Sequence, residues 1–197
     1  MNHLAHTLLS GPDADVVLGG MLGDFWHGAL DPGWPAGVRA GVALHRKIDV
    51  YTDSHPVVAA ARAAFPPPWR RYAGIITDVY FDHRLVHEWD RYAREPLAEF
   101  SRRFIALLER NRDWLPADLN RFAMYFRAHD LFAAYAQRET IEQVLLGIGR
   151  RLKRANPLGA TGPVLWPRAG QLDEAFARFF PQLEAFAQEV RERLGVP

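Results

Sequence analysis

Prolines divide this chain into segments that are each about as long as one helix. Proline has no backbone N–H to donate, and its ring clashes with the preceding turn, so it ends or begins helices. Most of the 14 prolines lie at such boundaries in the sequence pattern. They are Pro12, Pro32, Pro35, Pro56, Pro66, Pro67, Pro68, Pro96, Pro116, Pro157, Pro163, Pro167 and Pro181.

Between the prolines, apolar residues recur at helical spacing. One such face is Leu97, Phe100, Phe104, Leu107 and Leu108, and a longer one is Leu172, Phe176, Phe179, Phe180, Leu183, Phe186, Val190 and Leu194. No run alternates apolar and polar residues as a strand does, and no Asn-Gly hairpin signal occurs. We therefore expect an all-α fold, a single compact multi-helix domain over residues 1–197. The pattern predicts about eight or nine helices, with residues 155–170 as a long irregular stretch.

Composition excludes several classes of function. The chain has no cysteine, which rules out disulfides, a thiolate nucleophile and cysteine metal ligands. The net charge of +1 is too small for non-specific nucleic-acid binding. No segment has the run of about 18 apolar residues that predicts a membrane span. The first residues lack the basic region of a signal peptide, so we expect a cytoplasmic protein.

Ionisable residues interrupt the apolar stripes of three helical segments. Residues 73–94 place Asp78 and Asp82 one turn apart on the apolar face, with His83 beside them. In residues 36–54 the stripe that begins with two valines continues as His45, Asp49 and Asp53, and residues 14–28 place Asp24 on the apolar face. Three helices therefore direct acids, two of them with histidine, toward the expected core.

Clustered buried carboxylates repel one another, and a divalent cation removes that penalty. Aspartate and histidine without sulfur favour Mn²⁺, Mg²⁺, Fe²⁺ or Zn²⁺. The spacing of four residues in His45/Asp49 and in Asp78/Asp82 lets two ligands converge from one helix. We interpret Asp24, His45, Asp49, Asp78 and Asp82 as a candidate metal cluster.

Structural interpretations remain open for several of these residues. The five acids and histidines of the cluster could instead form a salt-bridge network with Arg46 and Lys47. Asp53 equally suits a helix end. His3, His27 and His55 are more typical of surface or capping positions, and the isolated His129-Asp130 doublet lies outside the cluster.

Four motifs in the first half resemble the acyl carrier protein phosphodiesterase family. They are Met1-Asn2-x-Leu4-Ala5-His6, Gly20-x-Leu22-x-Asp24-Phe25, Leu44-His45-Arg46-Lys47-Ile48-Asp49-Val50-x-Thr52-Asp53 and Asp78-Val79-x-x-Asp82-His83. The resemblance implies a helical fold distantly related to HD-type phosphohydrolases, with the metal and catalytic cluster in residues 1–95 and supporting helices in residues 96–197. It also implies a Mn²⁺-dependent hydrolase that removes 4′-phosphopantetheine from holo-acyl carrier protein. Asn2 and His6 join the site only through this resemblance.

Phosphodiester hydrolysis assigns each residue type a role. A divalent metal acidifies water and clamps a phosphoryl oxygen. The expected metal ligands are Asp24, His45, Asp78 and Asp82; the expected catalytic residues are Asp49, His83, Arg46 and His6. Asp49 would be a ligand or orient the water, His83 would be a general acid or base, and Arg46 could bind phosphate oxygens. Asn2 and Asp53 are expected to bind substrate.

Acyl carrier proteins are strongly acidic, so we expect a cationic docking surface near the site. Arg70, Arg71, Arg150 and Arg151 are the candidates, with Lys153 and Arg154 beside the second pair.

Two other function classes remain. One is an HD-like phosphohydrolase acting on a nucleotide or a small phosphate ester. The other is a non-catalytic helical binding module whose acids are neutralised by Arg46, Lys47, Arg70 and Arg71. A di-iron site is disfavoured because no Glu-x-x-His pair occurs.

Overall fold

The computed structural model describes residues 1–197 and contains only helices and loops. The elements are α1 (His3–Leu9), α2 (Ala14–Leu22), α3 (Ala36–Ser54), α4 (Pro56–Ala63), η1 (Trp69–Tyr72), α5 (Ala73–His87), α6 (Trp89–Tyr92), α7 (Leu97–Arg110), α8 (Ala117–His129), α9 (Leu131–Ala134), α10 (Arg138–Arg151), η2 (Leu158–Ala160), α11 (Gly162–Leu165), η3 (Trp166–Arg168) and α12 (Ala169–Leu194). The labels η1 to η3 denote short 3₁₀ helices. The expected all-α fold is confirmed.

Prolines set several of the helix boundaries. Pro56 is the first residue of α4, while Pro35, Pro96 and Pro116 are the N-caps of α3, α7 and α8. These positions need no N–H donor, and the fixed φ of proline suits a chain that is entering a helix. Pro181 lies inside α12, which continues through it.

The helices are more numerous than the sequence pattern indicates. The additional ones include α6, α9 and α11, each only four residues long. Such a helix is too short to show a periodic apolar face. Residues 155–170 are also not the irregular stretch that we expected, because η2, α11, η3 and the start of α12 lie within them.

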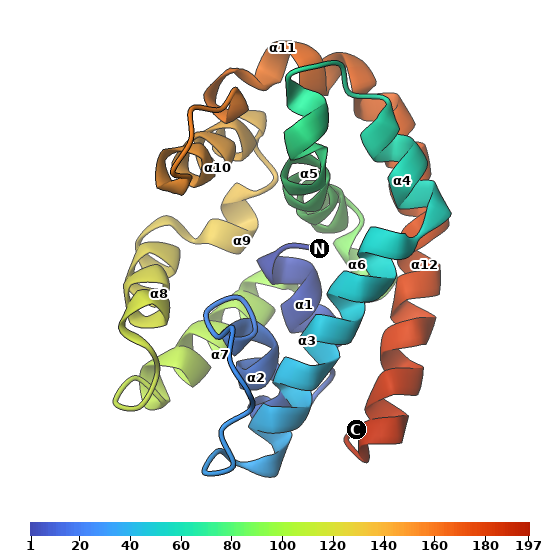
Figure 1. Ribbon diagram of the computed structural model, residues 1–197. Coiled ribbons are helices and arrows are strands. Elements are labelled where there is room, and N and C mark those ends of the chain that lie inside the picture. Colours follow the sequence, from blue (N-terminus) through green and yellow to red (C-terminus); the bar gives the residue numbers. More distant parts are fainter.

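One hydrophobic cluster of 45 buried residues runs through the whole chain. The long helix α12 packs against α3, α4 and α5 along one side of the molecule (Figure 1). Helices α8, α9 and α10 form the opposite side, and α1 lies between the two sides. A single shared core makes the chain one domain. No helix combines the length and apolar character needed to cross a lipid bilayer.

Two glycines bring α2 and α3 into direct backbone contact. A Cβ on Gly19 would lie 2.1 Å from the carbonyl oxygen of Val38, and one on Gly41 would lie 2.2 Å from that of Val16. Real Cβ atoms do not approach that closely, so only glycine fits at either position. This contact fixes the distance between the end of α2 and the middle of α3.

Helix α1 is buried at the centre, against α2, α5 and α12. Its N-terminal end is held from elsewhere in the chain: Asn2 Nδ2 donates to Tyr135 Oη at 2.9 Å. Its C-terminal end is held by Arg191 Nη1, which donates to the carbonyl oxygen of Leu9. Helix α1 is therefore fixed in the interior, in contact with α2, α5 and α12.

Candidate active site

Two histidines and an aspartate from α1 and α3 form the centre of the site. His6 Nε2 lies 3.1 Å from Asp49 Oδ1, and His45 Nε2 lies 3.2 Å from Asp49 Oδ2. The two imidazole rings stack with their centroids 3.8 Å apart. The ligand atoms of His6, His45 and Asp49 all lie within 4.8 Å of one another, which makes this trio a possible metal site.

Asp24 joins the trio from the loop that follows α2. Its Oδ1 lies 3.7 Å from His45 Nε2, and its Oδ2 lies 2.8 Å from His3 Nδ1. Gly23 permits this approach, because a Cβ there would lie 2.3 Å from His45 Cγ. The close packing of α2 against α3 thus places Asp24 beside His45 and His3.

The pKa values reflect this crowding. Burial and the neighbouring His45 lower the pKa of His6 to about 4, so that imidazole is neutral at neutral pH. Burial opposes ionisation of Asp49 and Asp24, yet the adjacent histidines hold the pKa of both carboxyls well below the usual range. Burial also opposes protonation of His45, but Asp49 and Asp24 raise its pKa.

The donor set fits a divalent cation. Both ring nitrogens of His6 are buried and make no well-directed hydrogen bond, and the only acid close to Nε2 is Asp49, at 3.1 Å. Such a buried imidazole is costly unless another group binds it. His45 Nδ1 lies 2.8 Å from the carbonyl oxygen of Gly20, which directs Nε2 toward the carboxylates. Such a backbone contact fixes the tautomer of metal-binding histidines. His6, His45 and Asp49 can therefore offer two nitrogens and one carboxylate to one ion, with Asp24 beside His45.

A polar pocket of about 320 Å³ opens onto this cluster. Its lining residues are Gly23, Asp24, Trp26, His27, His45, Arg46 and Asp49. Arg46 donates from Nη2 to the carbonyl oxygens of Gly28 and Trp26, at 2.7 and 3.4 Å. These bonds hold the loop after α2 at the pocket mouth.

Asp82 contacts backbone rather than other ionisable side chains. It is completely buried, and its two carboxylate oxygens accept hydrogen bonds from the backbone N–H groups of Leu4 and Ala5, at 2.8 and 3.1 Å. Burial raises the pKa of Asp82 to about 7, although these two bonds oppose the rise. The carboxyl therefore caps α1, the helix that carries His6.

Asp78 lies at the edge of the cluster and contacts two cations. Its Oδ1 accepts a hydrogen bond from Arg62 Nη2 at 3.2 Å and lies 3.5 Å from the α-amino nitrogen of Met1. That nitrogen is also 3.8 Å from Asp49 Oδ1. Asp53 is 69% exposed and accepts from Arg62 Nη1 at 2.8 Å. Both aspartates are thus joined through Arg62.

His83 faces away from the trio. Its Nδ1 lies 2.7 Å from the carbonyl oxygen of Tyr135, and its ring packs against Tyr80, His87 and Trp166. Burial lowers its pKa.

The four arginines expected to bind the partner are exposed. Arg70 and Arg71 lie in η1, and Arg150 and Arg151 form the end of α10. Trp69 Nε1 donates to the carbonyl oxygen of Pro157 at 3.2 Å, which brings η1 next to the segment that follows α10.

Two residues near the site were missed by the sequence patterns. His3 suited a surface or capping position, yet it is mostly buried and pairs with Asp24. The only available signal was its spacing of three from His6 on a short helix. Arg62 lies at the end of α4 and gave no signal, because its partners Asp53 and Asp78 lie on two other helices, α3 and α5.

Comparison with known proteins agrees with the resemblance seen in the motifs. The sequence profile of the acyl carrier protein phosphodiesterase family matches residues 1–183. The chain is 30% identical over 184 residues to the acyl carrier protein phosphodiesterase of Photorhabdus laumondii, covering 93% of each chain. It is 32% identical over 193 residues to that of Klebsiella pneumoniae strain 342, covering 95% of this chain and 98% of the relative.

The acyl carrier protein phosphodiesterase of Yersinia pestis is 29% identical over 189 residues, covering 95% of this chain and 98% of the relative. No solved structure shows significant similarity. The family match spans nearly the whole chain and includes every element that contributes to the site. The chain therefore belongs to the acyl carrier protein phosphodiesterase family.

Proposed function

We propose that this protein hydrolyses the phosphodiester that joins 4′-phosphopantetheine to a serine of holo-acyl carrier protein. Water adds to phosphorus, the bond from phosphorus to the serine oxygen breaks, and that oxygen takes a proton. The products are apo-acyl carrier protein with a free serine and 4′-phosphopantetheine. The observation that carries the proposal is the His6, His45 and Asp49 trio beneath a polar pocket, in a chain of this family.

We propose His6, His45, Asp49 and Asp24 as the metal ligands. Mn²⁺ is the ion that the family resemblance implies, and Mg²⁺, Fe²⁺ or Zn²⁺ also suit nitrogen and carboxylate donors. A bound divalent cation would lower the pKa of water and offset charge on the phosphoryl group. The carbonyl oxygen of Gly20 orients His45, and His3 orients Asp24.

For the proton that goes to the serine oxygen, we favour His3. Its Nδ1 contacts Asp24, which lines the pocket, so its Nε2 remains available to carry a proton. A histidine paired with a carboxylate is a common general acid. His83 contacts the carbonyl oxygen of Tyr135 and the ring of Trp166 rather than the trio. These contacts support a role for His83 in holding Tyr135 in place, not in proton transfer.

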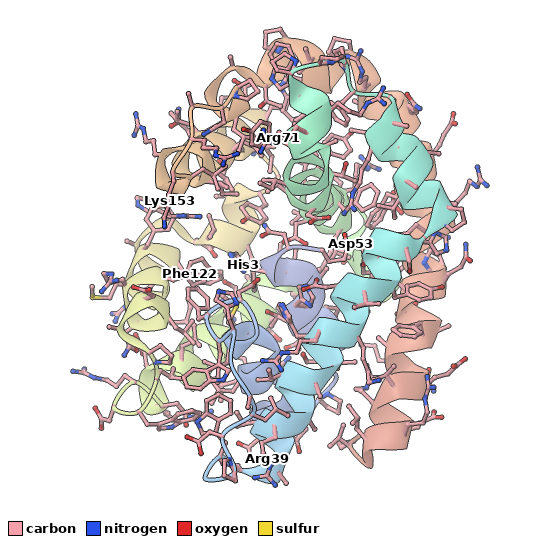
Figure 2. The ribbon with its side chains drawn as sticks, viewed as in Figure 1. His3, Arg39, Asp53, Arg71, Phe122 and Lys153 are labelled. Carbon is pink, nitrogen blue, oxygen red and sulfur yellow. The ribbon has the colours of Figure 1, made fainter.

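The exposed arginines support docking of an acidic carrier protein. Arg71, Arg150, Arg151, Lys153 and Arg154 form no ion pair with an acid of this chain, so their charge is available to a partner. Figure 2 shows Arg71 and Lys153 above the region in which His3 and Phe122 face each other. The His3 and Phe122 rings are 4.6 Å apart, beside Asp24. A carrier bound there would have its serine near the pocket.

Incubation with holo-acyl carrier protein and Mn²⁺, followed by intact-mass measurement, tests this function. We expect loss of the prosthetic group with the wild-type protein. Neither chelator-treated protein nor the Asp49→Asn variant should remove it, because both lack a complete metal site. An unchanged carrier mass, together with hydrolysis of a nucleotide, would instead support a phosphohydrolase for small substrates.

A further inference from the structure

Arg62 reaches the edge of the candidate active site from the last turn of α4. Its side chain is 19% exposed, and its guanidinium lies between acids of α3 and α5. Nη1 donates to Asp53 Oδ1 at 2.8 Å and Nη2 donates to Asp78 Oδ1 at 3.2 Å. The two carboxylates come from different helices, so the cation is held at a defined position between them.

A short series of polar contacts connects Arg62 to the proposed metal ligands. Asp78 Oδ1, which binds Arg62, lies 3.5 Å from the Met1 nitrogen, and that nitrogen lies 3.8 Å from Asp49 Oδ1. Asp49 is in turn 3.2 Å from His45. The guanidinium therefore belongs to the same polar array as the trio.

The hydrogen-bonding capacity of Arg62 is not saturated. A guanidinium has five N–H donors in a planar fork that matches two phosphate oxygens. Here one nitrogen contacts each carboxylate, and the buried Nε has no partner. Asp53 is 69% exposed, so its ion pair with Arg62 is screened by water and exchangeable at little cost.

We propose that Arg62 binds the non-bridging oxygens of the phosphodiester, with the phosphoryl group replacing Asp53 while Asp78 keeps the guanidinium in place. This proposal rests on the phosphodiesterase function argued above. Arg62 would stabilise the negative charge that accumulates on those oxygens as water adds to phosphorus. Asp53 would act as a reversible competitor for the guanidinium.

Arg84 offers a matched control on the other side of α5. Its side chain is 23% exposed, and its guanidinium also contacts two carboxylates, Glu88 at 2.9 Å and Asp173 at 3.0 Å. Neither acid contacts the trio. Any purely structural effect of shortening a half-buried, doubly paired arginine should therefore be similar for Arg62→Lys and Arg84→Lys.

Kinetics on holo-acyl carrier protein with Mn²⁺ provide the first measurement. We expect Arg62→Lys to lower kcat/KM about 100-fold, the usual loss when a donor to the transition state is removed. Arg84→Lys should retain wild-type kcat/KM. Equal activities of Arg62→Lys and wild type would overturn the proposal, as would equal losses in both lysine variants.

Protection by inorganic phosphate provides a measurement that needs no turnover. Phosphate at constant ionic strength should raise the Tm of wild type and of Arg84→Lys but not that of Arg62→Lys. Asp53→Asn should be protected at lower phosphate concentrations, because it removes the competitor. This variant tests the proposal even where an Arg62 variant folds poorly.

Equal phosphate protection in wild type, Arg62→Lys and Asp53→Asn would overturn the role of Arg62. Loss of protection in Arg62→Lys, together with no hydrolysis of holo-acyl carrier protein by wild type, would support Arg62 and reject the proposed function. The two conclusions are thus tested separately.

Discussion

The two carboxylate oxygens of Asp82 accept hydrogen bonds from the backbone of α1, so this side chain acts as an N-cap supplied by another helix. The capping position, Asn2, makes no such bond with its own side chain. Asp82 therefore fixes both the start and the direction of the helix that carries His3 and His6. Its contacts support a positioning role in the site.

We expect Asp82→Ala to lower the free energy of unfolding substantially. The substitution leaves two buried N–H groups without an acceptor, at a cost of about 1–3 kcal/mol each. Denaturant unfolding of the metal-free protein measures the effect. Asp53→Ala is the control, because an exposed acid in a screened ion pair should change stability by less than about 1 kcal/mol. Equal stabilities of the two variants would contradict the capping role.

At this scale the sequence predicts part of the site. His45 and Asp49 could be recognised because they interrupt the apolar stripe of α3, a helix long enough to show one. The same pattern pointed to Asp24, although α2 ends at Leu22 and Asp24 lies in the loop after it and not on the expected helix over residues 14–28. His6 entered only through the family resemblance, because the seven residues of α1 are too few for a clear period. Arg62 could not be found, since its role depends on Asp78 and Asp53 being brought to it by tertiary contacts.

At the scale of the helices, the contact between α2 and α3 sets the geometry of the site. Gly19 and Gly41 let the two backbones touch, and Gly23 lets His45 pack under the loop that carries Asp24. A longer distance between these helices would move Asp24 away from His45. The close contacts at these glycines therefore help to keep Asp24 beside His45.

Gly19→Ala should destabilise the protein and weaken metal binding, because the new methyl would overlap the Val38 carbonyl. We expect a loss of about 1–3 kcal/mol, as for other overpacked positions. Gly147→Ala on α10 is the control: a Cβ there meets nothing within 4 Å. It should stabilise the protein by about 0.5–1 kcal/mol through helix propensity. Thermal melts with and without Mn²⁺ measure both, and stabilisation by Gly19→Ala would show that the contact is loose.

The number of helices was harder to predict from the sequence than the all-α fold class. The long amphipathic helices α7 and α12 follow directly from their apolar faces. The four-residue helices α6, α9 and α11 form where long-range packing and local turns meet, which no single stretch of sequence encodes. The all-α class is thus a property of local pattern, whereas the short connections depend on the assembled core.

For the whole molecule, charge distribution matters more than net charge. The total is only +1, yet acids gather at the pocket while unpaired arginines gather at η1 and the end of α10. Attraction of an acidic carrier over such a surface weakens with salt, on a Debye length of about 8 Å at physiological ionic strength.

Reversing the charge of Arg150 and Arg151 to Glu should raise KM for holo-acyl carrier protein about tenfold and flatten its salt dependence. Hydrolysis of a small artificial phosphodiester should be unchanged. The control is the same reversal at Arg102 and Arg103 on α7, which already pair with Glu99 and Glu95. Steady-state kinetics at several salt concentrations measure KM and its salt dependence for both double variants. Equal effects of the two double variants on KM would rule out docking at the end of α10.

The anchoring of α1 has a consequence for the order of synthesis. The helix lies near the start of the chain, but its two ends are held by Tyr135 and by Arg191. On a ribosome these partners emerge long after the histidines of α1. A nascent chain that stops before α12 would carry every proposed ligand without the bond that closes the far end of α1. Hydrolytic activity should therefore begin only once the last helix has been released.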